Sequence, residues 1–177
     1  LLMPYEYRCT LRRIVDADTL DCDIDLGFGV IYAKQRIRFE GIDTPESAQT
    51  CRRDGVMWRC GIEATNLLKK LIRGSNVSCI ERDRDHYGRV VADCRANGVN
   101  LSATMVELGM ALAYRRYSKD YVSNETAAKI AKRGLWSSQF LNKNQKFSHT
   151  FNQAGIFYYW CKVHPFMTGT ITVEEAN

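Results

Sequence analysis

The sequence lacks a long apolar run: it contains no stretch of about 18 apolar residues, so we expect no transmembrane helix. It also lacks a recognisable signal peptide, but the chain begins at Leu1 rather than Met, so this absence says nothing about export. A large excess of one charge is missing too, because the formal net charge is +5. Such a modest excess suits a polyanionic partner without requiring one.

The composition is that of a folded, water-soluble chain. Hydrophobic residues make up 45% and charged residues 25%, which excludes a disordered or membrane-embedded protein. A length of 177 residues allows one domain of ordinary size and a small appendage.

The seven cysteines are the best indication of the compartment. Six of them fall into three possible pairs, which favours disulfides and an oxidising compartment, so we expect a secreted or periplasmic protein. The alternative is a set of buried free thiols in a cytosolic protein. The pairs are Cys9 with Cys22 on either side of the first turn, Cys51 with Cys60 around a short loop, and Cys79 with Cys94 on consecutive strands.

The predicted elements follow the order three strands, a helix, two strands and two helices. Strands are predicted where apolar and polar residues alternate, and helices where apolar residues recur every three to four positions. Gly74 is expected to end the first helix and Asn100 to cap the second, while the third is expected to begin at a cap on Asn124 and to end at Gly134. This order fits a closed five-stranded barrel of the OB type with three helices, in the α+β or mainly β class. The strands are predicted over residues 5–14, 20–26, 35–39, 77–80 and 90–94, and the first helix over 61–73.

An acidic stripe lies on the second predicted strand, at Asp21, Asp23 and Asp25. Side chains two residues apart on a strand share a face, so the three carboxylates lie together. We expect a solvated outer face, with a ligand role for one of them as the alternative.

Two turns carry the residues best suited to chemistry. Residues 41–47 (Gly-Ile-Asp-Thr-Pro-Glu-Ser) put two carboxylates and a hydroxyl into one turn that follows a strand. An earlier turn over residues 16–19 carries Asp18, and if the two strands are neighbours, Asp18 and Asp43 converge on one hard cation. Arg38 and Arg89 add guanidinium groups that bind phosphate in a fork. Together these groups indicate a site that cleaves phosphodiesters.

Residues 5 to about 138 resemble the staphylococcal nuclease family. The motifs that carry the resemblance occur in the family's order and spacing over about three quarters of the chain. The cysteine-bracketed loop and the tyrosine-rich run after Tyr114 resemble the exported bacterial branch of the family. The matching motifs are residues 15–19 (Val-Asp-Ala-Asp-Thr), Arg38 with residues 41–46, residues 87–89 (Tyr-Gly-Arg), residues 109–114 and residues 134–136 (Gly-Leu-Trp).

The resemblance implies a calcium-dependent nuclease. Asp18, Asp43 and the backbone carbonyl of Thr44 would bind Ca²⁺, and Glu46 would orient or deprotonate the attacking water. Asp18 and Asp43 as simple turn caps, and Glu46 as a surface carboxylate, are the alternatives.

The resemblance also implies how nucleic acid is held. Arg38 and Arg89 would clamp the phosphate, and spacing to Asp43 selects Arg38 over its neighbour Arg36. Tyr87 and Tyr114 would lie against the nucleotide, which suits DNA or RNA with low sequence specificity, although Tyr114 alternatively belongs to the core.

Two positions depart from the family pattern. Ala17 replaces the glycine usual between the two aspartates, and a need for positive φ there would strain the turn and misplace Asp18. His86 stands where a lysine is frequent, which weakens phosphate contacts or makes them sensitive to pH. We expect weakened but real activity.

The C-terminal part has a different character. We expect a nuclease domain over residues 1–140, a polar linker over 141–145, and a β segment over 146–177. Cys161, His164 and Met167 have the ligand types of a blue-copper site, and this segment resembles the end of an amicyanin-like cupredoxin. About 30 residues cannot bury a core of their own, so it packs on the barrel, pairs with a partner chain or another copy, or is a vestige of gene fusion.

Two other functions compete with the nuclease. One is a non-catalytic nucleic-acid-binding module on the same fold, which would be expected to lack the carboxylates and arginines retained here. The other is a copper-binding protein that acts through the C-terminal segment.

Overall fold

A computed structural model describes residues 5–53, 56–137, 155–160 and 168–174. The chain divides into two compact units, Leu1–Phe140 and Leu141–Asn177. Within the described residues, no helix is long and apolar enough to cross a membrane.

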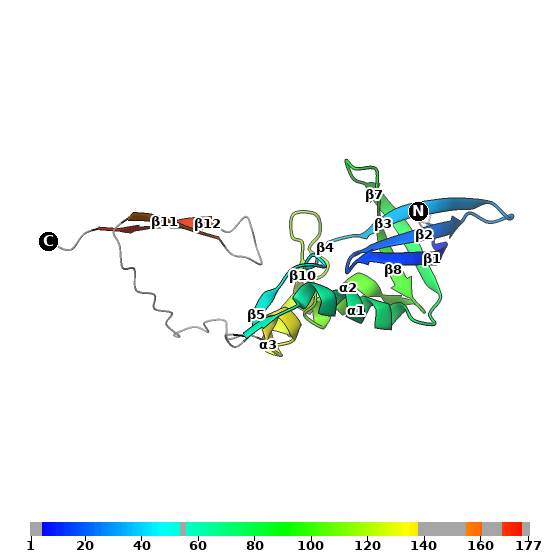
Figure 1. Cartoon of the computed structure of the whole chain (residues 1–177). Coiled ribbons are helices and arrows are strands. Elements are labelled where there is room, and N and C mark those ends of the chain that lie inside the picture. The colour runs from blue at the N-terminus through cyan, green and yellow to red at the C-terminus, as the bar shows by residue number, and fades with distance from the viewer. Residues whose placement is uncertain (1–4, 54–55, 138–154, 161–167, 175–177) are drawn as a thin grey trace. The chain divides into compact units, whose positions relative to one another are not determined.

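The first unit is built around a closed barrel of five strands in the order β3-β2-β1-β7-β8 (Figure 1). Neighbouring strands are antiparallel, and the parallel pairing of β3 with β8 closes the barrel. This confirms the predicted OB-type barrel, and closure leaves its strands without open edges. The strands are β1 (Tyr7–Asp16), β2 (Thr19–Asp25), β3 (Ile31–Phe39), β7 (Val77–Arg84) and β8 (Val90–Ala96), with the short β9 (Val99–Asn100) added beside β8.

Three α-helices accompany the barrel: α1 (Cys60–Ile72), α2 (Leu101–Glu107) and α3 (Val122–Ile130). Helix α1 buries Ala64, Leu68 and Ile72, which the four-residue spacing places on one face. Asn100 caps α2 as predicted, because its side chain accepts a hydrogen bond from the backbone N–H of Ala103.

The third helix differs from the prediction. Asn124 was expected to cap it, but α3 begins at Val122, so Asn124 lies within the first turn. The buried Tyr121 and Glu125 fix the earlier start by packing inward from its first turn. Gly134 does not end α3 either; with a φ of 53° it begins the short 3₁₀ helix η1 (Gly134–Trp136).

Two short strands hold the turn that carries Asp43. Strand β4 (Ile42–Asp43) pairs with β10 (Leu112–Ala113), with Asp43 opposite Leu112. The N–H of Tyr114 then donates to the carbonyl of Gly41 at 2.9 Å. The backbone therefore brings Tyr114 next to the Asp43 turn, although the two are far apart in the sequence.

All three predicted disulfides are present: Cys9–Cys22, Cys51–Cys60 and Cys79–Cys94. The Cys51–Cys60 bond joins the hairpin of β5 (Cys51–Arg53) and β6 (Val56–Trp58) to the first residue of α1. The other two lie within the barrel, Cys79 directly opposite Cys94.

The second unit contains an antiparallel pair, β11 (Gly155–Trp160) and β12 (Thr168–Val173), with Gly155 opposite Val173. The proposed copper ligands Cys161, His164 and Met167 lie outside the described residues.

Candidate active site

Arg38 joins the two aspartates that the sequence singled out. It lies near the end of β3, beside the start of β2, where Thr19 is its paired residue. One terminal nitrogen lies 2.8 Å from the Asp18 carboxylate, and the other lies 3.3 Å from Asp43 and donates to the carbonyl of Ile42 at 3.3 Å. The structure therefore brings Asp18, Asp43 and Arg38 together, as expected for neighbouring strands.

Asp18 is held firmly in this arrangement. Asp18 is 4% exposed. One of its carboxylate oxygens accepts a hydrogen bond from Arg38, and the other accepts one from the Thr19 hydroxyl at 2.8 Å. The neighbouring Ala17 is fully buried and is not among the described residues with positive φ. The alanine therefore takes part in the core without the strain considered above.

Glu46 lies beside these carboxylates at the exposed end of the turn. Partial burial, a hydrogen bond with Asp16 and the nearby charges of Asp18 and Asp43 raise the pKa of the Glu46 carboxyl above its ordinary value of 4.5. Asp16 itself accepts a hydrogen bond from the Ser47 hydroxyl at 2.5 Å. Asp16 is thus a member of the cluster that the sequence interpretation passed over, although it stands in the same turn as Asp18.

The Glu46 turn rests on the first turn of α1. The N–H of Gly61 donates to the carbonyl of Gln49 at 3.2 Å, and the Gln49 N–H donates to the carbonyl of Glu46 at 2.7 Å. A Cβ added at Gly61 would lie 1.8 Å from that Glu46 carbonyl oxygen, so the close approach requires glycine. The Cys51–Cys60 disulfide fixes the residue before Gly61.

Arg89 and Tyr87 come from the loop between β7 and β8. Asp85 organises this loop: one of its oxygens accepts from the Arg89 Nε at 2.6 Å, and the other accepts from the backbone N–H groups of Tyr87 and Arg89. Tyr87 is 74% exposed, its ring lies tilted against that of His86 with centroids 3.7 Å apart, and the Arg89 guanidinium is 5.4 Å from the Tyr87 ring centroid. An exposed ring beside a guanidinium suits a nucleotide base next to its phosphate.

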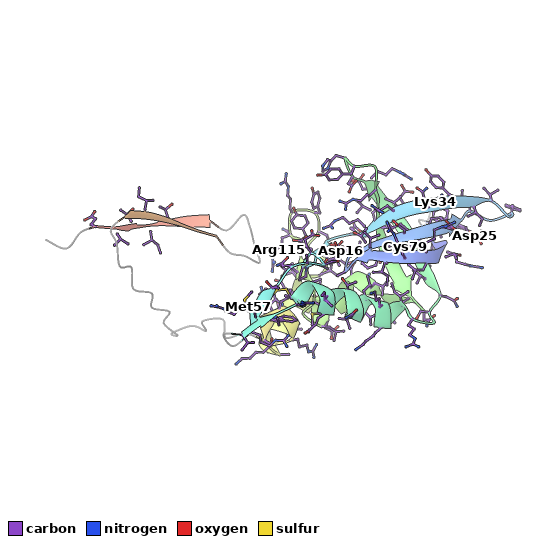
Figure 2. The ribbon with its side chains drawn as sticks, viewed as in Figure 1. Asp16, Asp25, Lys34, Met57, Cys79 and Arg115 are labelled. Carbon is purple, nitrogen blue, oxygen red and sulfur yellow. A yellow bond between two sulfur atoms is a disulfide. The ribbon has the colours of Figure 1, made fainter. Side chains whose placement is uncertain are left out.

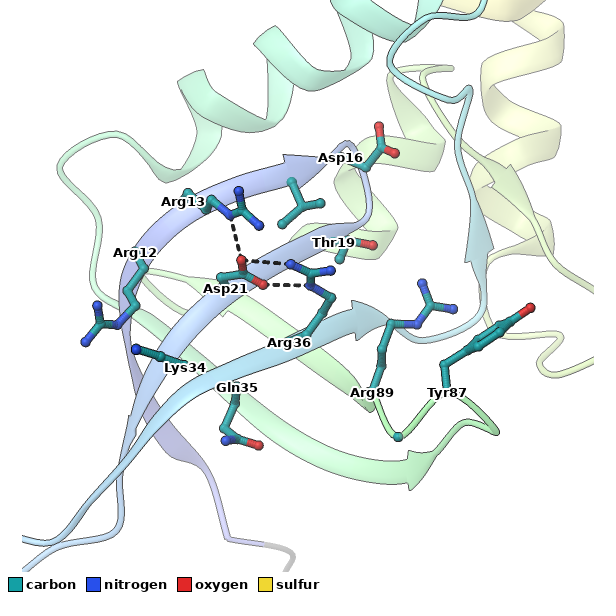
Figure 3. A pocket seen from close by; sticks show the side chains of 12 residues that line it. Arg12, Arg13, Asp16, Thr19, Asp21, Lys34, Gln35, Arg36, Tyr87 and Arg89 are labelled. Atoms are coloured by element: carbon teal, nitrogen blue, oxygen red, sulfur yellow. Dashed lines mark hydrogen bonds and ion pairs between the residues drawn. The ribbon is translucent and has the colours of Figure 1, made fainter.

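A groove of about 900 Å³ has Asp16 and Thr19 on one wall and Tyr87 and Arg89 on another (Figure 3). Of the acidic residues described above, only Asp16 lines it; Asp18, Asp43 and Glu46 do not. Figure 2 shows that Asp16 lies at one end of the β1–β2 hairpin and Asp25 at the other. Tyr114 does not line this groove, although its backbone is attached to the Asp43 turn.

Asp18, Asp43 and Thr44 are the residues to test for a metal. Among the residues that the structure describes, no three His, Cys, Asp or Glu side chains converge closely enough to form a ready-made metal cage. The charge nevertheless fits a hard cation. Asp18 and Asp43 both contact the Arg38 guanidinium, and the Glu46 carboxyl interacts with the carboxylates of Asp16, Asp18 and Asp43. A cation there would complete its shell with water and backbone oxygen, as Ca²⁺ does with its 6–8 oxygen ligands.

The acidic stripe on β2 was expected to face solvent, and the structure gives two of its members arginine partners. Asp21 pairs with Arg13 at 2.6 Å and with Arg36 at 2.8 Å, while Asp23 pairs with Arg12 at 2.6 Å. These three arginines also line the groove. The sequence interpretation missed them because consecutive arginines on a strand are expected to face opposite sides.

The family model described as "Staphylococcal nuclease homologue" matches residues 36–138, more than half of the chain. An Escherichia coli protein named "Uncharacterized endonuclease" is 34% identical over 128 residues, which cover 71% of this chain and 74% of that protein. A Shigella flexneri protein named "Micrococcal nuclease" is 33% identical over 147 residues, 75% of each chain.

Plant relatives are longer. A protein of Oryza sativa subsp. japonica named "Probable staphylococcal-like nuclease CAN1" is 32% identical over 129 residues, which cover 72% of this chain but 36% of that protein. The chain thus spans about a third of the length of the rice relative. The family match ends at residue 138, so it gives no support to the cupredoxin resemblance of the C-terminal segment. The matched motifs, the closed barrel and the aligned relatives agree, and the chain belongs to the staphylococcal nuclease family.

Proposed function

We propose that this chain is a calcium-dependent nuclease that hydrolyses phosphodiester bonds of DNA or RNA with little sequence specificity. The observation that carries the proposal is the cluster in which Arg38 joins Asp18 and Asp43 while Glu46 lies beside them with a raised pKa. Relatives named endonuclease and micrococcal nuclease support the same reaction class.

Each residue has a role that its chemistry allows. Asp18, Asp43 and the Thr44 carbonyl hold the ion, and a bound Ca²⁺ supplies a Lewis acid for a phosphate oxygen. Glu46 is the general base, and its raised pKa brings it closer to the pH at which a base accepts a proton from water.

The cationic and aromatic groups bind the substrate. Arg38 and Arg89 stabilise the negative charge that grows on the phosphate in the transition state. Tyr87 offers an exposed ring on which any base can stack, so we expect little discrimination between sequences. Tyr114 does not line the groove, so its proposed contact with the nucleotide would be made at the Asp43 turn, to which its backbone is attached.

The test is cleavage of single-stranded DNA by the wild-type chain in Ca²⁺, in excess EGTA, and by Glu46→Gln in Ca²⁺. We expect cleavage in the first condition, none with EGTA, and a loss of roughly a hundredfold or more for Glu46→Gln. Glu63→Gln, an exposed glutamate in the first turn of α1, is the control and should retain full activity.

Binding without cleavage in all conditions would contradict the proposal and favour a nucleic-acid-binding module. Activity that survives EGTA and Glu46→Gln alike would exclude both the calcium ion and the assigned base.

We also propose an extracytoplasmic location. Three disulfides persist in an oxidising compartment and not in a reducing cytosol. Mass measurement of the native chain with a thiol-alkylating reagent should find six of the seven cysteines protected, and alkylation of all seven would contradict the proposal.

A further inference from the structure

The groove beside the site continues past Tyr87 and Arg89 onto the outer face of β1, β2 and β3 (Figure 3). There its lining is basic and includes Arg12, Arg13 and Lys34. We propose that this face is a binding track for the polynucleotide strand beyond the cleaved phosphate, with Arg12, Arg13, Lys34 and Arg36 as its cationic contacts. The inference rests on the proposed function for the identity of the ligand.

The cations form two rows across the three strands. In one row, Asp21 of β2 lies between Arg13 of β1 and Arg36 of β3, and it is the paired residue of both in the strand registers. In the second row, Asp23 accepts from the Arg12 side chain at 2.6 Å and from the backbone N–H of Lys34 at 2.8 Å. Asp21 and Asp23 are two residues apart, so the rows lie about 7 Å apart along the groove.

The carboxylates lie beneath the guanidinium groups. The side chains of Asp21 and Asp23 are 16% and 19% exposed, whereas those of Arg12, Arg13 and Arg36 are 45–63% exposed. The Arg36 hydrogen bond, assisted by Arg13, holds the pKa of Asp21 at about 2, so the carboxylate stays ionised and keeps its partners in place. An approaching anion therefore meets cations that are already positioned, which lowers the entropy lost on binding.

The terminal nitrogens of Arg12 and Arg13 remain available, whereas one terminal nitrogen of Arg36 donates to Asp21 at 3.1 Å. Arg12 and Arg13 each contact their aspartate through Nε, and within the described residues their terminal nitrogens donate no hydrogen bond. The four cationic residues Arg12, Arg13, Lys34 and Arg36 outnumber Asp21 and Asp23 by two, so together they carry two net positive charges. That excess of positive charge is suited to binding successive phosphates of one nucleic-acid strand.

Two irregularities in the sheet aim these side chains into one groove. The β1–β2 register shifts between Leu11 and Arg13, so Arg12 is an extra residue, and Arg12 and Arg13 both reach the groove although they are consecutive. The β2–β3 register shifts between Cys22 and Ile24, and opposite that shift Lys34 has a φ of 56°. Surface ion pairs contribute little to stability, so a purely structural ladder does not account for this geometry.

The experiment compares Arg12→Gln/Arg13→Gln with Lys69→Gln/Lys70→Gln, which removes the same charge from α1 outside the groove. Binding of a fluorescent single-stranded DNA of about 20 nucleotides is measured in EGTA, so that cleavage is not needed. We expect the groove variant to bind roughly tenfold more weakly, with a salt-dependence slope reduced by about 1.4 because two phosphate contacts are lost. The α1 variant should bind like the wild type, and Arg12→Lys/Arg13→Lys should recover part of the loss.

Substrate length provides the second measurement. In Ca²⁺, the loss of kcat/KM in Arg12→Gln/Arg13→Gln should shrink as the substrate is shortened to a dinucleotide. Three results would overturn the proposed track. They are an equal loss of kcat/KM in Arg12→Gln/Arg13→Gln on the long and the short substrate, an equal loss of DNA binding in Lys69→Gln/Lys70→Gln, or unchanged DNA binding in Arg12→Gln/Arg13→Gln. If the wild type binds DNA but does not cleave it, the hydrolysis proposal fails while the difference between the two variants still decides the track.

Discussion

The acidic cluster around Asp18 and Asp43 and the basic track both combine carboxylates with guanidinium groups. Carboxylates are in excess in the cluster, and guanidinium groups are in excess on the track. In the acidic cluster, the Glu46 carboxyl interacts with those of Asp16, Asp18 and Asp43, and the Arg38 guanidinium contacts two of these carboxylates, Asp18 and Asp43. On the track, arginines outnumber and cover the carboxylates of Asp21 and Asp23. The group in excess is the basis for what we propose that each region binds: a cation in the acidic cluster and a polyanion on the basic track.

Burial strengthens the contrast. Arg38 has a 22% exposed side chain, whereas Arg36, two residues earlier on the same strand, has a 45% exposed one. Charges that lie further from water interact more strongly, so the cluster depends on exact placement while the track tolerates adjustment. The two regions should therefore respond differently to equivalent substitutions.

The largest difference is expected from exchanging arginine for lysine on β3. Arg38→Lys cannot contact Asp18 and Asp43 at once, so kcat on single-stranded DNA should fall roughly a hundredfold. Arg36→Lys keeps its charge on the exposed face and should lose less than about threefold. Steady-state kinetics of the two variants checks this, and equal losses would remove the distinction between cluster and track.

A smaller effect is expected at the support of Glu46. Gly61→Ala should raise the helix propensity of α1 by about 1 kcal/mol, but the new Cβ would meet the Glu46 carbonyl oxygen at 1.8 Å. We expect the collision to prevail, with kcat about tenfold lower and a lower Tm. Asn66→Ala, at an exposed position of the same helix, is the control. A Gly61→Ala variant that is more stable and fully active would show that the Glu46 turn can move independently of α1.

The smallest effects are opposite pH dependences of stability, measured by thermal unfolding in EGTA. The Asp21 carboxyl has a folded pKa of about 2 against 3.8, so its contribution is complete above pH 3.8 and is lost as the pH falls through 2. Asp21→Asn should lower Tm by roughly 2–4 °C at pH 7 and by less near pH 2.

The pKa of the Glu46 carboxyl is raised above its ordinary value of 4.5, so its ionisation opposes folding. Glu46→Gln should therefore slightly raise Tm at pH 7 but not below pH 4.5. If Asp21→Asn and Glu46→Gln changed Tm in the same direction at pH 7, the contrast between the acidic cluster and the basic track would be contradicted.

The sequence predicted the barrel well because its strands alternate and its helices have clear apolar faces. The closed five-stranded barrel, the cap at Asn100 and the three disulfides were all predicted, since each depends on local pattern or cysteine position. The start of α3 was wrong, because burial of Tyr121 and Glu125 outweighed the capping preference of Asn124.

Residues of the candidate active site could be predicted in two situations: where one turn carries several functional groups, as around Asp43, and where the residue belongs to a motif of the family. The track was not, because it depends on the bulge at Arg12 and the left-handed backbone of Lys34, which no local pattern indicates. The role of Asp16 was also missed, since its contact with Glu46 joins turns that are 30 residues apart.

The most direct test of the contrast is a calcium titration of the ¹⁵N-labelled chain, followed by amide chemical shifts. We predict shifts concentrated in residues 16–19 and 41–46, their loss in Asp43→Asn, and their persistence in Asp21→Asn. Calcium shifts centred on the β1–β2–β3 track, or unchanged shifts in Asp43→Asn, would contradict the assignment of the acidic cluster as the cation site.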